Sequence, residues 1–141
     1  MAYLPMISGG GANLTGTLLW TNPTPGSNIT TNKQLVASTD IQDYDYLRLV
    51  WCYSTTAQNI TGEMIINKAE LANQTPSSNC VRTSFYGCRE GGSNGRSFSR
   101  ALWLNNPNIG DGIWTAQCTQ SYGTGIANNM CIPLYLYGIK S

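Results

Sequence analysis

The sequence contains no histidine, and only 11% of its 141 residues are charged. Without histidine the chain lacks the commonest general base and every Ser–His or Cys–His nucleophile pair. It also lacks the usual nitrogen ligand of structural zinc, and it has no Cys-x-x-Cys motif. The net charge of +1 comes from scattered basic residues, so there is no basic surface for nucleic acid. We therefore expect a protein that is not an enzyme and that needs no metal, no cofactor and no nucleic acid.

Long apolar runs and an export signal are absent as well. No segment approaches the ~18 apolar residues that a membrane-spanning helix needs, and the N-terminus lacks the basic and apolar regions of a signal peptide. We expect no membrane insertion. The five cysteines are an odd number, which argues against a disulfide framework and favours buried free thiols. They are Cys52, Cys80, Cys88, Cys118 and Cys131.

Glycine and proline punctuate the sequence at short intervals, as in "ISGGGA", "TNPTPGSN" and "NNPNIGDG". The runs between them are rich in Val, Ile, Thr, Tyr, Trp and Leu, which is typical of an all-β protein. About eight strands suit an antiparallel β-sandwich of two sheets with a jelly-roll-like arrangement. The predicted strands are Thr17–Trp20, Gln34–Ser38, Tyr46–Ser54, Gly62–Asn67, Val81–Gly87, Ser97–Leu104, Ile113–Ser121 and Cys131–Ile139.

The last two predicted strands are separated by "GTGIAN", which indicates a hairpin. An antiparallel register centred on this loop sets Cys118 opposite Cys131, within cross-strand reach, and Trp114 opposite Tyr135. The reduced form of this cysteine pair is our expectation, with a disulfide as the alternative under oxidation. Cys80 and Cys88, which flank "VRTSFYG", are a second candidate pair.

The final strand is apolar on both faces, although chain ends usually fray unless something holds them. Its first face carries Ile132, Leu134 and Leu136, and its second carries Pro133, Tyr135, Tyr137 and Ile139. We expect the first face to pack on the core. The second face then meets another subunit through Tyr135, Tyr137 and Ile139, or alternatively is covered by loops of the same chain. Proline lacks a ladder donor, so Pro133 is expected at the strand start or facing an edge.

Residues 1–14 differ from the body at 15–141. The apolar peptide "MAYLPMIS" is followed by three glycines, which form a flexible linker. We interpret residues 1–14 as an anchoring segment on a hinge, with a disordered end as the alternative. The candidate anchor residues are Tyr3, Leu4, Met6 and Ile7.

Carbohydrate binding is the ligand chemistry that the polar and aromatic residues suit best. Aromatic faces stack on sugar rings, while amides and guanidinium groups bond their hydroxyls. The candidates in the central glycine-rich loop and near the last hairpin are Tyr86, Arg89, Arg96, Trp114 and Tyr122, although a strand tryptophan such as Trp114 usually belongs to a core. Asp43 and Asp45 straddle Tyr44, a spacing as common in solvated turns as in active sites.

Three stretches resemble a small module of bacteriophage virion proteins, namely "TGTLLWTNPTPGS", "DYDYLRLVW" and "NNMCIPLYLYGIKS". Such modules form tail-fibre tips, other receptor-binding domains and decoration-type domains, and the resemblance runs from about Thr15 to the C-terminus. It implies a β-sandwich, usually a homotrimer, displayed on a phage particle and assembled in the bacterial cytoplasm. No functional residue of that group carries over. One departure is that the module makes up nearly the whole chain rather than the end of a long fibre.

Our leading hypothesis is a virion surface protein that contributes to host attachment. Its partners would be copies of itself, other tail or capsid proteins and host-surface carbohydrate. The alternative is a capsid decoration or head-fibre protein anchored to the capsid by its N-terminal peptide. A third hypothesis, a secreted cellular lectin, requires a cleaved leader and intact disulfides.

Overall fold

A computed structural model describes residues 15–31, 33–36, 41, 43–68, 80–89, 96–105, 112–114, 119–120 and 127–141. Every element it describes is a strand, and all the strand pairings are antiparallel, so the described part of the protein is all-β. The elements are β1 (Thr17–Thr21), β2 (Lys33–Val36), β3 (Tyr46–Ser54), β4 (Ile60–Asn67), β5 (Cys80–Arg89), β6 (Arg96–Asn105), β7 (Gly112–Trp114), β8 (Thr119–Gln120) and β9 (Met130–Ile139).

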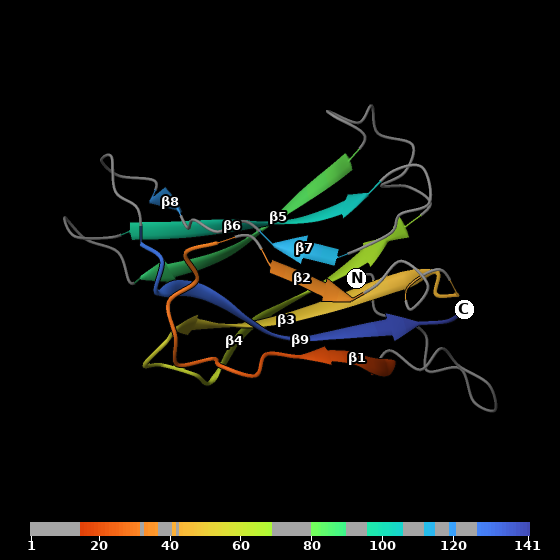
Figure 1. Cartoon of the computed structure of the whole chain (residues 1–141), viewed down its shortest axis with the longest axis horizontal. Coiled ribbons are helices and arrows are strands. Elements are labelled where there is room, and N and C mark those ends of the chain that lie inside the picture. Colours follow the sequence, from red (N-terminus) through yellow and green to blue (C-terminus); the bar gives the residue numbers. More distant parts are fainter. Residues whose placement is uncertain are drawn as a thin grey trace, which may run out of the picture.

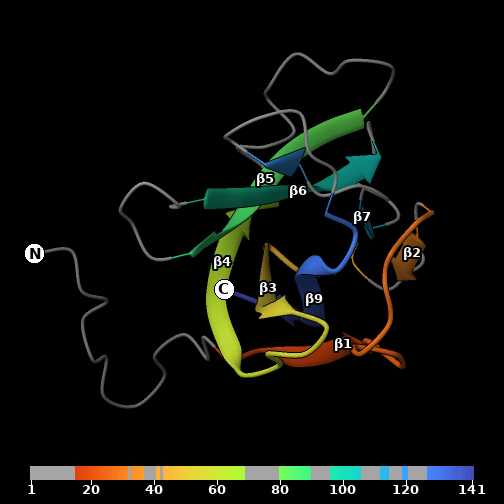
Figure 2. The same ribbon diagram turned by 90° about the vertical axis from the view of Figure 1, so that its left-hand side faces the viewer.

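The strands form two sheets. The first has four strands in the order β1-β9-β3-β4, and the second has the order β2-β7-β6-β5 with β8 also paired to β6. In Figure 1 the four-stranded sheet lies below the five-stranded sheet, and the turned view in Figure 2 again places β1 below β5 and β6. Most predicted strands agree with the observed bounds to within about two residues. The exception is the predicted strand 113–121, which contains two short strands, β7 and β8.

The predicted hairpin between the last two strands is wrong. β9 lies in the interior of the four-stranded sheet, where Tyr135 pairs with Thr21 of β1 and with Val50 of β3. Trp114 lies in the other sheet and pairs with Leu102 of β6. The prediction assumed that neighbours in sequence pair in space, which holds for only about two-thirds of consecutive strands. Cys118 lies outside the described residues.

Pro133 also differs from expectation, because it occupies an interior strand rather than an edge. The register of β9 against β3 shifts between Val50 and Trp51, which marks a β-bulge beside Pro133. A bulge tolerates proline because it already interrupts the ladder of backbone hydrogen bonds. Buried Asn22 completes the local bonding: its side-chain amide donates to the Pro133 carbonyl at 2.9 Å, and its backbone amide donates to the Leu134 carbonyl at 2.8 Å.

The cysteines confirm the free-thiol prediction where the structure describes them. Cys52 and Cys131 are both buried and unpaired by disulfide. Burial raises the pKa of the Cys52 thiol. The proposed juxtaposition of Cys80 and Cys88 is wrong, since both lie on β5. At ~3.3 Å per residue their Cα atoms are roughly 26 Å apart, far beyond the ~7 Å limit for a disulfide.

One hydrophobic core cluster takes side chains from both sheets. It includes Leu49 of β3 and Leu136 of β9 from one sheet, and Leu102 of β6 from the other. These three side chains have no exposed surface. The predicted core face of the last strand is therefore confirmed for Leu136, which is buried in this cluster.

A buried arginine links the sheets at one end of this core. Arg100 of β6 is 2% exposed, and its guanidinium donates to the carbonyls of Cys131 and Met130, each at 3.0 Å, and to that of Asn128 at 3.3 Å. Cys131 has a positive φ of 49°, a conformation that costs about 1–3 kcal/mol for a residue with a side chain. The arginine therefore satisfies carbonyl groups at a strained kink where β9 begins.

Candidate functional site

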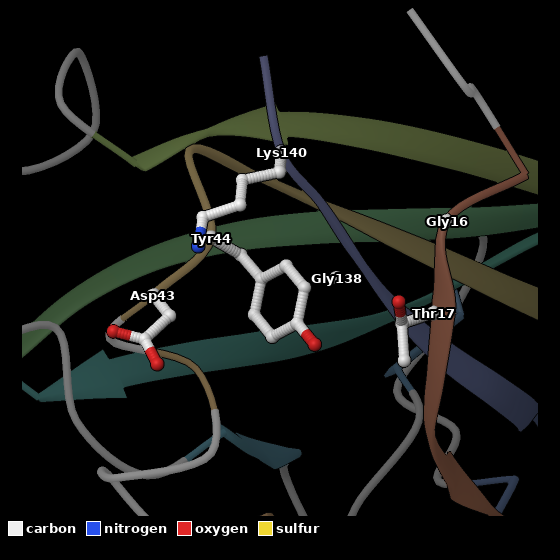
Figure 3. Close-up of a pocket in the computed structure, with 6 residues that line it drawn as sticks. All are labelled: Gly16, Thr17, Asp43, Tyr44, Gly138 and Lys140. Atoms are coloured by element: carbon white, nitrogen blue, oxygen red, sulfur yellow. The ribbon is translucent and has the colours of Figure 1, made fainter.

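An open pocket of about 290 Å³ lies where three segments that are far apart in sequence meet. They are the start of β1, the turn before β3 and the end of β9. The residues that line the pocket are Gly16, Thr17, Asp43, Tyr44, Gly138 and Lys140. Figure 3 shows the Tyr44 ring in the middle, with Asp43 on one side and Thr17 on the other.

Two glycines bring these segments into contact. A Cβ atom at Gly138 would lie 2.6 Å from both Cδ atoms of Tyr44, so the ring rests on bare backbone. Gly16 has a φ of +75°, and a Cβ there would lie 2.6 Å from the Gly138 carbonyl oxygen. Real Cβ atoms do not approach so closely, and few residues other than glycine adopt this φ. Glycine is therefore required at both positions for Tyr44 to lie where it does.

A buried lysine holds the turn that carries Tyr44. The Nζ of Lys68 donates to the Ile41 carbonyl and, at 2.7 Å, to the Tyr44 carbonyl. The Lys68 backbone amide donates to the Asp45 carbonyl at 3.1 Å, and the Tyr44 amide donates to the Ile41 carbonyl at 3.3 Å. Burial lowers the pKa of Lys68, and the nearby carboxylates of Asp45 and Asp43 partly offset this. The turn is thus fixed from within the fold.

Asp45 ties the end of β9 to the same turn. Its backbone amide donates to the Ile139 carbonyl at 3.0 Å, and its Oδ2 accepts bonds from the amide and the hydroxyl of Ser141, both at 2.8 Å. These bonds, the backbone one first, hold the pKa of Asp45 below its usual value. Lys140 is therefore presented to the pocket by a segment bonded on both sides.

The pocket offers chemically mixed groups that are available for a ligand. In the described part of the chain, no hydrogen bond or ion pair engages the side chains of Asp43, Lys140 or Thr17. They supply an acceptor carboxylate, a donor ammonium group and a hydroxyl group that does both. Among the described residues, no group of three or more His, Cys, Asp or Glu side chains is placed to hold a metal ion. This chemistry supports reversible binding through hydrogen bonds and ring contact.

A second feature is the outward surface of the four-stranded sheet, which we call the tyrosine face. The cross-strand partners that share it include Leu18, Thr21, Arg48, Val50, Glu63, Ile65, Tyr135 and Tyr137, of which Val50 is only 1% exposed. Leu18 is 51% exposed and Ile65 is 45% exposed. The rings of Tyr135 and Tyr137 are 6.1 Å apart, and the Arg48 guanidinium lies 4.9 Å from the Tyr137 ring.

An ion pair crosses the same face. Arg48 Nη2 lies 2.6 Å from Glu63 Oε2, with both side chains partly open to solvent. Ile139 contributes little surface, because it is only 2% exposed within its own chain. Gly16 is part of what covers it, since a Cβ there would lie 2.9 Å from Ile139 Cγ1. Of the three predicted interface residues, Tyr135 and Tyr137 are thus the ones with surface left for a partner.

The structure places the predicted sugar-binding residues on strands rather than in a loop. Tyr86 and Arg89 belong to β5, and Arg96 begins β6 directly opposite Arg89. The β5–β6 hairpin is longer than the sequence predicts, because the hydrogen bonds between strands join backbone groups and do not depend on which side chains the residues carry. Trp114 pairs with β6 at Leu102, roughly 20 Å along the strand from Arg96. The backbone therefore brings Arg89 and Arg96 together, places Tyr86 three residues away along β5, and leaves Trp114 apart.

The other predicted residues cannot be placed. Tyr122 and the four anchor candidates, which are Tyr3, Leu4, Met6 and Ile7, lie outside the described residues. The sequence does not predict the pocket, although it singles out Asp43 and Asp45 on either side of Tyr44. As the solvated-turn interpretation of this spacing holds, both carboxylates lie in a turn before β3. The signals in the sequence were Gly16 beside Thr17 and Gly138 two residues before Lys140, but neither glycine by itself indicates a contact with Tyr44.

In the described residues, no helix is long and apolar enough to cross a bilayer. Comparisons of the chain with protein-family models, with curated proteins and with solved structures found no match. The functional argument therefore depends on the pocket, the tyrosine face and the sequence itself.

Proposed function

We propose that this protein is a bacteriophage virion structural protein, displayed on the particle surface as a homotrimeric host-attachment module of the tail-fibre-tip kind. We further infer that its two sheets pack face to face as a jelly-roll-like β-sandwich. The shared core cluster supports this arrangement, since Leu49 and Leu136 of one sheet contact the same cluster as Leu102 of the other.

The observation that carries the proposal is the tyrosine face. Leu18 and Ile65 leave about half of their surface exposed on a sheet that also presents Tyr135 and Tyr137. Aromatic residues are enriched in protein interfaces, and contiguous apolar surface on a soluble protein marks an interaction site. The Arg48–Glu63 pair supplies charges of both signs, so copies of this face are not kept apart by like charge. We assign it to contacts between copies of this chain.

The first test is the absolute mass of the purified, reduced protein by size-exclusion chromatography with light scattering. We expect an oligomer of three chains for the wild type and a single chain for Tyr135→Ser/Tyr137→Ser. Ile60→Ser is the control, since Ile60 is 64% exposed at the far end of β4 and should leave the mass unchanged. A monomeric wild type, or a double variant of unchanged mass, would refute the assignment of this face.

The virion location needs a separate test. We expect antibodies against this chain to detect it in purified particles of the phage that encodes it, and immunogold labelling to mark the tail tip. Label on the head would replace the host-attachment role by capsid decoration. Particles that lack the protein altogether would refute a virion function of either kind.

A further inference from the structure

The geometry points to the pocket around Tyr44 as a carbohydrate site: we propose that it binds one pyranose ring of a bacterial surface polysaccharide. This inference rests on the proposed host-attachment function and names the ligand class and residues that would serve it. The pocket is distinct from the β5–β6 hairpin where the sequence had suggested sugar contacts.

The shape of the pocket is the first argument. Its volume of about 290 Å³ lies at the lower limit of the ~300–1,000 Å³ typical of small-molecule sites. A Cβ atom at position 138 would collide with the Tyr44 ring, and one at position 16 would collide with the Gly138 carbonyl, so the two glycines let the three segments pack closely around the pocket. A pocket of this size is suited to a single ring rather than an extended chain.

Its chemistry is the second argument. Figure 3 shows the Tyr44 ring nearly face-on, Asp43 and Thr17 on opposite sides, and the Lys140 side chain reaching toward the Asp43 side. An aromatic ring flanked by an acceptor, a donor and a hydroxyl matches a sugar, which has apolar C–H faces and a rim of hydroxyls that both donate and accept. Each of these protein groups is free to take a ligand partner in the described part of the chain.

Other ligand classes fit less well. A lipid chain would leave the charges of Asp43 and Lys140 without solvent or partners. A phosphate would be attracted by Lys140 but repelled by Asp43, with the carboxylate of Asp45 close behind. A divalent cation would need several oxygen ligands, and Oδ2 of Asp45 already accepts two bonds from Ser141. A neutral polyhydroxylated ring meets none of these objections.

The positions of the pocket residues suggest why the site is rigid. Lys68 fixes the turn below Tyr44, and Asp45 fixes the end of β9 beside Lys140. Neither bond involves the groups that we assign to the ligand. A pre-organised site loses less entropy when it binds a small ligand, which matters because a single sugar ring offers few contacts.

The experiment is a ¹H–¹⁵N correlation titration of the full chain. The probes are glucose, galactose, N-acetylglucosamine and N-acetylgalactosamine, with inorganic phosphate as a competing ligand class. We expect at least one sugar to shift the amides of Gly16, Thr17, Tyr44, Gly138 and Lys140 in a saturable way. Phosphate should leave these amides unchanged. Shifts caused by phosphate alone, or no saturable shift with any sugar, would overturn the proposal.

Variants make the test specific. Asp43→Ala/Lys140→Ala removes two exposed groups and should weaken sugar binding by about tenfold or more. The matched control is Asn28→Ala/Thr30→Ala, two exposed polar residues beyond the opposite end of β1, which should bind sugar as the wild type does. Equal binding by the pocket variant would overturn the assignment.

The two proposals can fail separately. If the wild type is found in virions but no sugar shifts the pocket amides, the sugar site is refuted and the virion function stands. If particles lack the protein while the titration succeeds and the pocket variant fails to bind, the sugar site stands and the virion function is refuted.

Discussion

Replacing Arg100 by Met should be among the most destabilising single changes in this protein. The substitution keeps a long, flexible side chain but removes the donors that reach the carbonyls of Cys131, Met130 and Asn128. The carbonyl groups of Cys131 and Met130 lie at a buried kink, so water does not readily replace the guanidinium there. The loss therefore combines broken charge-assisted bonds with unsatisfied carbonyl groups.

The expected magnitude follows from these contacts. A hydrogen bond to a charged group contributes ~1.5–3 kcal/mol, and a buried carbonyl that is left without a donor costs ~1–3 kcal/mol. Because the three bonds share one side chain, their contributions do not simply add, and we expect about 3–5 kcal/mol in total. That is a large part of the ~5–15 kcal/mol that stabilises a typical domain. The melting temperature should fall by roughly 10–15 °C.

Urea unfolding followed by tryptophan fluorescence measures this loss, with all variants compared at one protein concentration because an oligomer's stability depends on it. Lys140→Met is the control, because it also replaces a cationic side chain by methionine but lies away from the tyrosine face. Lys140 is exposed, and in the described part of the chain its side chain makes no hydrogen bond or ion pair, so its loss should cost no more than about 0.5 kcal/mol. If Arg100→Met costs no more than Lys140→Met, the buried guanidinium does not stabilise the start of β9 as we argue.

Three further changes test the residues around the pocket. Gly138→Ala forces a Cβ into the Tyr44 ring and should cost about 1–3 kcal/mol, so an unchanged urea midpoint would contradict the packing described. The pKa of Lys68 is lower in the folded protein than in the unfolded chain, so the unfolded chain binds the Lys68 proton more tightly. The free energy of unfolding of the wild type, relative to that of Lys68→Met, should therefore rise as pH increases toward 10.5. A difference that stays constant with pH would be inconsistent with burial of the ammonium group. The pKa of Asp45 is lowered in the folded protein, so its bonds to Ser141 stabilise the fold above pH 3.8 and are lost as pH falls through the folded-state pKa. Asp45→Asn should therefore speed hydrogen exchange of the Ser141 amide at neutral pH. Equal exchange in both proteins would show that this contact is not maintained.

The positions of the strands could be predicted from the sequence because they depend on local signals. β3 was predicted with its observed bounds, Tyr46–Ser54, since polar residues flank a run that is rich in strand formers. The neighbours of β9 could not be predicted in this way. Alternation of side chains shows which residues share a face, but it does not show whether β9 pairs with β7 or lies between β1 and β3.

The pocket was beyond prediction for a related reason. The motif around Tyr44 was noticeable, but its partners lie near the two ends of the described chain, at Gly16 and Gly138. A glycine in a sequence does not reveal which ring will rest against it. Nor does the sequence show that Lys68 holds the turn, because a lysine is normally expected in solvent rather than bonded to buried carbonyls.

The interior position of β9 has a consequence for how the protein is made. A ribosome synthesises about 5–20 residues per second from the N-terminus, so β1 and β3 emerge long before the strand that must lie between them. Until Met130–Ile139 leaves the exit tunnel, neither strand has its native neighbour on that side, and β3 holds an apolar, unpaired edge. The four-stranded sheet can therefore close only after Met130–Ile139 has been synthesised. Nascent chains of this protein should depend on chaperones during that interval more than chains whose central strands are made first.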